Sequence, residues 1–403
     1  MPRSPTTPLA LLLLVMPAAS VLQFRAIAPL AIATLAAVVA MGWRAEGRVP
    51  WSRGPTLWAA LALAGWGALS AIWAVDPRRA ATEALLLGAF FALGAAAAGV
   101  VARADTPAHR TLLRWLAVGL ATGVALAAVD HATDNAVRAA VRGLREHDIT
   151  LSFGLKPAIT VFAVLLPLAI AAPITGWLRA LLAAASVAVA LWLPAETAKI
   201  AIVAGLVAYA LASWVPRLTR TALAASLALA ILAMPVLLGA VFTSGATAGF
   251  LPFSAAHRVV IWDFSLSRIA ERPLLGWGFE ASRAIPGGKA NATPATLDRL
   301  GIVEPGQRAR FALVNAESLP LHPHNAALQL RLELGMVGAL LAALLVALLA
   351  SRARTPAAIG AMTAASVVGS LSYGLWQGWW IALLLVLIAA TRALPAEGRE
   401  DIP

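Results

Sequence analysis

Long apolar runs separated by short polar turns make up most of the chain. A run of about 20 apolar residues is long enough to cross a bilayer as a helix. The pattern predicts twelve membrane spans. They lie near 8–23, 27–43, 56–75, 80–102, 112–130, 157–177, 179–194, 198–215, 221–243, 325–350, 356–372 and 376–391.

Composition supports this interpretation over two or three soluble domains. Of the 403 residues, 61% are hydrophobic and 12% are charged, whereas a soluble domain has about 45–50% apolar and about 25% charged residues. The chain has no cysteine, which excludes disulfides, thiolate metal sites and a cysteine nucleophile. The fold class predicted is an all-α polytopic membrane protein. The segment 1–20 has features of a secretory signal, but another span follows at once, so we expect a retained first helix.

The net charge of +12 would suggest nucleic-acid binding in a soluble protein. Here most arginines lie in short turns, where topology explains them, and we expect no nucleic-acid partner. With both termini in the cytoplasm, inside turns and tails hold 14 arginines, whereas the short outside turns hold Arg25, Arg78, Arg79 and Lys199. The chain then divides into spans 1–9 (1–243, with a short outer loop near 131–156), a long outer loop (244–323) and spans 10–12 (324–403).

Both outer loops carry arginines that topology does not require. Arg142 and Arg145 lie in the first loop, and Arg258 lies in the second. Arginine presents a planar fork of donors that matches phosphate oxygens, so these residues are candidates for binding a lipid-linked pyrophosphate. Solvated ion pairs are the alternative for each one, with Asp134, Glu146, Asp148 and Asp263 as partners. Lys199 at an outer helix mouth either binds phosphate or pairs with Glu196, three residues before it.

The stretch 255–278, "AAHRVVIWDFSLSRIAERPLLGWG", predicts a helix in the long loop. Val259, Trp262, Leu266 and Ile269 recur at helical spacing and form one apolar face, and Pro273, Gly276 and Gly278 end the helix. Such a helix should lie on the outer membrane face. Arg258 and Trp262 are four residues apart and share one side. Anchoring at the interface alone would also explain Trp262.

The stretch 321–335, "LHPHNAALQLRLELG", places two histidines at the outer mouth of span ten. Asn325 is a candidate helix cap. A neutral imidazole suits proton abstraction near pH 7, so His322 and His324 are candidate bases, and the sequence does not choose between them. An H-x-H pair is a weak metal signal, and no D-x-D motif occurs in a loop, so we expect no metal and no cofactor.

The combination "RVVIW", "ERPLLGWGFE" and "HPHNAALQLRLELGMVG" after many spans resembles the superfamily of O-antigen ligases (WaaL), O-antigen polymerases (Wzy) and bacterial O-linked oligosaccharyltransferases. The pattern H-N-x-x-L-x-x-x-x-E-L-G at 324–335 carries the resemblance most specifically. Arg258 and Trp262 match the family's arginine before a tryptophan, and His324 matches its histidine before asparagine. Lys199 departs from the family's usual arginine and lacks the bidentate fork.

The resemblance implies a GT-C-like glycosyltransferase of the bacterial inner membrane with its active site facing the periplasm. It would move a glycan from undecaprenyl pyrophosphate to a sugar hydroxyl of lipid A–core and invert the anomeric centre. His324 would be the base, and Arg258 would be catalytic and bind pyrophosphate with Arg142, Arg145 and Lys199. His322, Asn325 and Trp262 would be secondary site residues.

Three alternatives remain open at this point. Two are an O-antigen polymerase and a protein O-oligosaccharyltransferase, which would use the same kind of donor. The third belongs to another class, a transporter or flippase of lipid-linked glycans. Transporters tend to show internal repeats and mid-membrane charges, whereas the polar residues here gather at the outer helix mouths.

Overall fold

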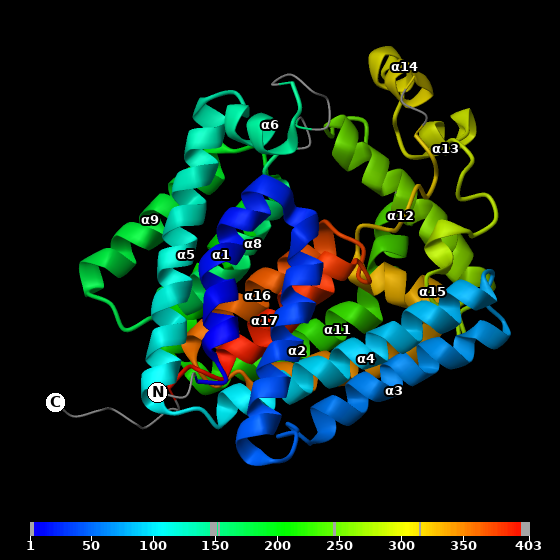
Figure 1. Cartoon of the computed structure of the whole chain (residues 1–403). Coiled ribbons are helices and arrows are strands. Elements are labelled where there is room, and N and C mark those ends of the chain that lie inside the picture. Colours follow the sequence, from blue (N-terminus) through cyan, green and yellow to red (C-terminus); the bar gives the residue numbers. More distant parts are fainter. Residues whose placement is uncertain (1–3, 146–150, 152–153, 245–246, 314–315, 396–403) are drawn as a thin grey trace.

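The computed structural model of the chain describes residues 4–145, 151, 154–244, 247–313 and 316–395. Its regular structure there is helical, apart from an isolated β-bridge between Asn291 and Glu317 (Figure 1). Each of the twelve predicted spans overlaps a helix, although the helix of span 157–177 ends eight residues early, at Ala169. These helices are α1 (Thr7–Gln23), α2 (Ile27–Glu46), α3 (Pro55–Leu69), α4 (Pro77–Ala102), α5 (Thr106–Ala132), α8 (Lys156–Ala169), α9 (Gly176–Trp192), α10 (Glu196–Trp214), α11 (Pro216–Thr243), α15 (Ala326–Arg352), α16 (Pro356–Leu371) and α17 (Gly378–Thr391).

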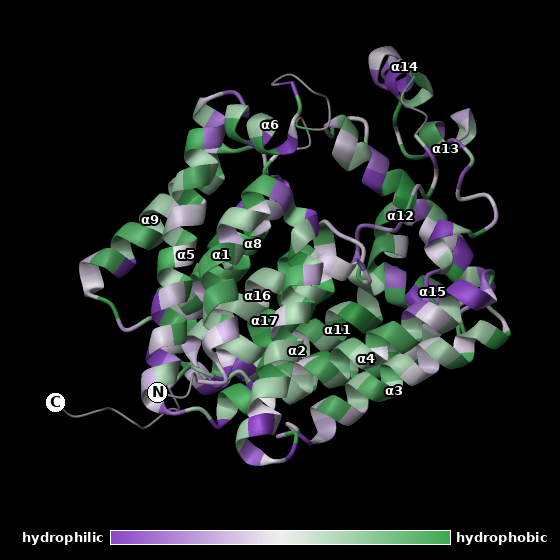
Figure 2. Cartoon of the chain, in the orientation of Figure 1, coloured by the Kyte–Doolittle hydropathy of each residue, from purple (hydrophilic) through white to green (hydrophobic). Residues whose placement is uncertain are grey.

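Length and hydropathy agree with a membrane protein. Among the described residues, seven helical segments are long and apolar enough to cross a bilayer, and the first of them, Thr7–Glu46, contains both α1 and α2. Helices α8, α9, α16 and α17 are apolar but shorter. Figure 2 shows apolar residues along most of the long helices and hydrophilic residues gathered on α12, α13 and α14 and around the connection after α2. The prediction of an all-α polytopic membrane protein is confirmed.

Connections predicted to lie on the same side of the membrane contact one another. Four hydrogen bonds join connecting segments that are distant in the sequence. In each bond both segments are predicted to lie on the same side of the membrane, as expected when successive long helices alternate in direction. These contacts are Arg142–Leu22 (2.7 Å) and Arg79–Glu280 (3.0 Å) on the outer side, and Arg103–Glu46 (2.7 Å) and Arg114–Pro173 (3.2 Å) on the inner side.

The long loop between α11 and α15 contains helices of its own. It contains α12 (Phe253–Glu271), the 3-10 turn η3 (Ala281–Arg283), α13 (Pro294–Arg299) and α14 (Pro305–Leu313), with α13 and α14 at the edge of the molecule (Figure 1). A small apolar core holds this part together, comprising Ala248, Ala256, Val260, Leu297, Leu300, Ile302, Phe311 and Ala316.

Helix α12 begins two residues before the predicted start and ends at Glu271, before Pro273. Its apolar side packs against the start of α15: Ile261 and Ile269 share a buried cluster with Leu328 and Leu332, and Trp262 and Leu266 pack at its border. The loop helix is therefore fixed to the first turns of a membrane helix, which is the contact that brings Arg258 toward the histidines.

Helix α15 is broken at Gly335, whose φ of 65° and ψ of −160° are not helical. Such a positive φ favours glycine. The peptide groups freed by the break bond with the segment 273–278: Trp277 N–H donates to the Leu332 carbonyl (2.9 Å), Gly278 N–H to the Glu333 carbonyl (2.8 Å), and Met336 N–H to the Pro273 carbonyl (3.0 Å). The Trp66 indole donates to the Leu334 carbonyl (3.0 Å). The "PLLGWG" and "ELG" stretches thus complete each other's backbone hydrogen bonds.

Candidate active site

Asn325 begins α15 and fixes the chain that carries the two histidines. Its Oδ1 accepts a hydrogen bond from the Leu328 N–H (3.1 Å), so it caps the helix as its position predicted. The side chain is 3% exposed. His324, the preceding residue, has a φ of 54°, a conformation that is uncommon for a residue with a side chain. The cap and this turn of the backbone direct the His324 ring toward the connection between α16 and α17.

The His324 ring is bound through one nitrogen. Its Nδ1 is hydrogen-bonded to the backbone carbonyl of Ser372. A carbonyl only accepts, so Nδ1 carries the proton and Nε2 of the neutral ring keeps a free lone pair. Burial lowers the pKa of His324 to about 4, the Ser372 carbonyl acts in the opposite direction, and the charges of Arg258 and His257 lower it further. His324 is therefore neutral near pH 7, with an unprotonated Nε2.

His322 is engaged differently. The Gln377 amide oxygen accepts from the Trp379 indole (3.1 Å), so the Gln377 NH2 group faces His322 and donates to its Nε2 (3.2 Å). The proton of neutral His322 must then lie on Nδ1, which is buried without a partner among the described residues. Burial, then His324, then Arg283 lower the pKa of His322 to about 3. The two imidazole rings meet edge to face at 4.2 Å.

Helix α12 adds a cation beside this histidine pair. The Trp262 indole donates to the Pro323 carbonyl (2.8 Å) and holds α12 against the histidine segment. Arg258, on the same side of α12, is half-buried. Within the described part of the chain its guanidinium has no hydrogen bond or ion pair, and its charge acts on both His324 and Tyr373. Burial lowers the pKa of Arg258. The charge of Arg258, which has no ion pair among the described residues, therefore acts on the imidazole whose Nε2 has a free lone pair.

The other predicted site residues lie in different surroundings. Arg142, at the end of α6 (Ala136–Arg142), donates from Nε to the Leu22 carbonyl, and burial and Arg138 lower its pKa. Arg145 is exposed. Lys199 pairs with Glu196 at 2.8 Å. None of these contacts involves Arg258 or His324. Of the proposed acidic partners, Asp263 binds Arg299 through both carboxylate oxygens, whereas Glu146 and Asp148 lie outside the described residues.

Glu333 is a site residue that the sequence analysis quoted in its motif without giving it a role. The carboxylate is fully buried and accepts four hydrogen bonds. The donors come from the 276–283 segment, from α15 itself and from the α16–α17 connection. They are Glu280 N–H (3.0 Å), Ser282 hydroxyl (2.5 Å), Gln329 amide (3.1 Å) and Trp376 indole (2.6 Å). The sequence signal that could have identified Glu333 is an acidic residue within an apolar stretch, because such a residue must be buried with partners inside a membrane protein.

A second buried carboxylate, that of Glu280, is bound by two cations. Glu280 is 7% exposed and its Oε2 accepts from Arg79 Nε (3.0 Å) and Arg283 Nε (2.7 Å). Two guanidinium groups on one carboxylate leave a net positive charge, and Arg283 also acts on His322. The positive charge of Arg283 near His322 suits an anionic substrate.

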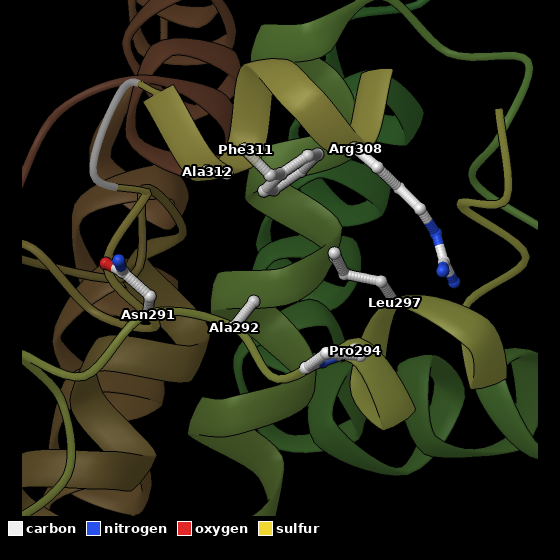
Figure 3. Close-up of a pocket in the computed structure, with 7 residues that line it drawn as sticks. All are labelled: Asn291, Ala292, Pro294, Leu297, Arg308, Phe311 and Ala312. Atoms are coloured by element: carbon white, nitrogen blue, oxygen red, sulfur yellow. The ribbon is translucent and has the colours of Figure 1, made fainter. Parts of the chain in front are cut away.

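A cavity of about 320 Å³ lies elsewhere, between α13 and α14 (Figure 3). Its lining comprises Asn291, Ala292, Pro294, Leu297, Arg308, Phe311 and Ala312. Arg308 points along the edge of the cavity in Figure 3 and is paired with Asp298. No residue of the histidine cluster lines this cavity, so the chemistry described above is located at the α12–α15 contact and not here.

Comparison with known proteins points to one family. Residues 180–343 match the family model Wzy_C, described as O-Antigen ligase. This range contains Lys199, Arg258, His322, His324 and Glu333. It runs from α9 through the long loop into α15, so the match includes the elements that meet at the histidine cluster.

Three similar proteins are named "Putative polysaccharide ligase". The Rickettsia conorii protein is 36% identical over 87 residues, which is 22% of this chain and 17% of that protein. The Rickettsia prowazekii protein is 41% identical over 85 residues, 21% of this chain and 17% of that protein. The Rickettsia bellii protein is 33% identical over 109 residues, 27% of this chain and 23% of that protein. The matches thus cover less than a quarter of each relative, and no solved structure matches the chain.

Proposed function

We propose that the chain is a glycosyltransferase that moves a glycan from undecaprenyl pyrophosphate to a sugar hydroxyl of lipid A–core, and the match of residues 180–343 to the O-antigen ligase family model supports this proposal. The reaction takes place at the periplasmic face of the bacterial inner membrane. The observation that carries the proposal is that the charge of Arg258, a guanidinium without an ion pair among the described residues, acts on the neutral ring of His324, whose Nε2 is unprotonated. One group accepts a proton and the other meets a developing negative charge.

His324 activates the acceptor. A sugar hydroxyl is a poor nucleophile until its proton is removed, and a neutral imidazole in hydrogen-bond reach can take that proton during attack. The hydroxyl oxygen forms a bond to the anomeric carbon from the face opposite the pyrophosphate, and its proton moves to Nε2. The Ser372 carbonyl holds the Nδ1–H side of the ring and stabilises the imidazolium that forms. The anomeric centre is inverted.

Arg258 acts on the leaving group. As the bond from the anomeric carbon to the pyrophosphate oxygen breaks, both electrons leave with the oxygen, and negative charge increases there. A half-buried guanidinium without an internal partner is already placed to bind that charge, and little reorganisation is needed. In the proposed mechanism Arg142, Arg145 and Lys199 contribute to pyrophosphate binding from a greater distance. Their positive charge attracts anionic lipid-linked substrates on the side of the membrane where Arg258 lies.

Substrate binding would also adjust the strength of the base. Burial and the charge of Arg258 both lower the pKa of His324 in the free protein. A bound pyrophosphate compensates the charge of Arg258 and adds negative charge nearby, which favours the protonated imidazole. The pKa of His324 therefore rises when the donor binds, so the ring becomes a better proton acceptor in the complex than in the free protein.

The test uses purified protein in proteoliposomes with lipid-linked donor and lipid A–core. We expect glycan-capped lipid A–core from the wild type, and we expect little product from His324→Ala and Arg258→Ala at equal protein levels. Wild-type rates in both variants would overturn the mechanism. Product analysis separates the alternatives: longer lipid-linked chains indicate an O-antigen polymerase, glycosylated protein indicates an O-oligosaccharyltransferase, and donor movement without transfer indicates a transporter or flippase.

A further inference from the structure

Arg331 is a buried arginine that has no acidic partner in the part of the chain that the structure describes. It lies in the second turn of α15 and is 8% exposed. Its Nη1 donates to the Met336 sulfur at 2.8 Å, and its Nε is buried with no acceptor among the described residues. A thioether is a weak acceptor, so most of the guanidinium's hydrogen-bonding capacity is unused.

The geometry of α15 explains why no internal group serves it. Leu328 and Leu332 face α12, whereas Leu330 and Leu334 join the main transmembrane core. Arg331 projects between these two directions and away from Glu333, which lies about 160–200° around the helix at 100° per residue. The carbonyls freed by the Gly335 break are also occupied, because they accept from Trp66 and the 277–278 backbone.

An unpaired guanidinium in a membrane helix is costly unless an anion compensates it. Paired buried arginine occurs elsewhere in the same chain: Arg138 is 2% exposed and binds Asp130 at 2.6 Å. The contrast indicates that the partner of Arg331 is supplied by a ligand. Helix α11 packs along α15, and Pro235 is the one buried side chain of α11. The exposed apolar side chains of α11, such as Leu229 and Leu237, indicate that membrane lipid lies beside this pair of helices.

We propose that Arg331 binds a phosphate group carried by a membrane lipid. Phosphate is the anion that a guanidinium recognises with two parallel hydrogen bonds, and a lipid delivers it at membrane depth. The site is distinct from Arg258, because it lies about two helical turns beyond His324 along α15. Two lipids carry this chemistry, a prenyl diphosphate and an anionic phospholipid. The inference concerns binding and does not depend on the transfer reaction.

Thermal unfolding of the full chain in detergent tests the proposal. Undecaprenyl diphosphate, phosphatidylglycerol and diacylglycerol are added separately, and the last lacks phosphate. At saturating ligand we expect at least one phosphate-bearing lipid to raise the Tm of the wild type by about 5 °C, and diacylglycerol to leave it unchanged. The phosphate lipid whose rise decreases more in Arg331→Met, described below, identifies the source. No rise with either phosphate lipid would overturn the proposal.

Variants separate a binding site from a structural role. Without lipid phosphate, Arg331→Met should unfold at the same temperature as the wild type or higher, because an uncompensated buried charge is removed. The rise with phosphatidylglycerol should then be lost, and the rise with undecaprenyl diphosphate should become smaller, because the donor site proposed at Arg258 still binds a diphosphate. Arg138→Met should lower the Tm with or without lipid, because it leaves Asp130 unpaired. Arg354→Met, which removes an exposed charge beyond the other end of α15, should keep the full lipid response. A lower Tm for Arg331→Met without lipid, or an undiminished lipid response, would overturn the proposal.

Discussion

The indole Nε1–H of Trp376 donates to Oε2 of Glu333 at 2.6 Å and joins the α16–α17 connection to the buried carboxylate of α15. The same connection supplies the Ser372 carbonyl that binds His324 and the Gln377 amide that binds His322. The position of both imidazoles therefore depends on a carboxylate that is itself a positioning group and does not face the proposed substrate.

Replacing Glu333 with glutamine should reduce both stability and transfer. All four of its partners donate, whereas a glutamine amide has one accepting oxygen and an NH2 group that would face donors. Each buried donor left without a partner costs about 1–3 kcal/mol. We expect a lower Tm and a kcat at least about tenfold lower, because the His324 ring loses its alignment. Glu271→Gln is the matched control: Glu271 is exposed on α12, and we expect a change within about 0.5 kcal/mol.

The two histidines should respond differently to the same substitution. His324→Gln removes a base whose Nε2 is free, so kcat should fall by about 10²–10⁴-fold. In His322, Nε2 already accepts from Gln377, so His322→Gln should lower kcat less than about tenfold. Steady-state kinetics with purified donor and acceptor measure both values. A larger loss of kcat for His322→Gln than for His324→Gln would show that His322, and not His324, is the base.

The apolar pattern was sufficient to predict the twelve apolar helices, because such a helix is specified by a run of consecutive apolar residues. The same reasoning placed the loop helix around Arg258 and Trp262 and the cap at Asn325. It could not reveal the break at Gly335, since the segment that stabilises the break lies some 60 residues earlier in the chain. It also left His322 and His324 equivalent, because the groups that distinguish them belong to the distant 372–377 connection.

In the pH profile of kcat/KM, which reports on the free protein, the decline on the acid side should occur at unusually low pH. The base must be unprotonated, and burial lowers the pKa of His324 to about 4. We therefore expect kcat/KM to stay level as pH falls from 7 to about 5 and to decline only near pH 4. The limb in kcat should lie at higher pH, because bound pyrophosphate raises the pKa of His324. A tenfold decline in kcat/KM per pH unit already below about 6.5 would show an ordinary, unperturbed imidazole.

The stability of the fold should decrease with acid at higher pH values than those at which kcat/KM declines. In the unfolded chain both histidines bind a proton near pH 6.5, whereas the folded protein holds His322 and His324 neutral down to about pH 3 and about pH 4. Between these values the unfolded state binds more protons, so the free energy of unfolding falls as pH falls. We expect the Tm to drop from pH 6.5 toward pH 4, with a smaller drop in the His322→Gln, His324→Gln double variant. An equal drop in both proteins would place the pH sensitivity elsewhere.

Gly335→Ala should disrupt the contact between α15 and the 273–278 segment. A β-carbon at this residue would lie 2.2 Å from the Leu274 carbonyl oxygen, which is backbone and cannot rotate away, and the φ of 65° is itself unfavourable for alanine. We expect a destabilisation of about 3 kcal/mol or more, measured as a lower Tm and a lower yield of folded protein. Gly239→Ala is the matched control in α11, where a β-carbon meets nothing within 4 Å; alanine there should be neutral or stabilising by up to about 1 kcal/mol. If both substitutions behave alike, the break at Gly335 is not required for the fold.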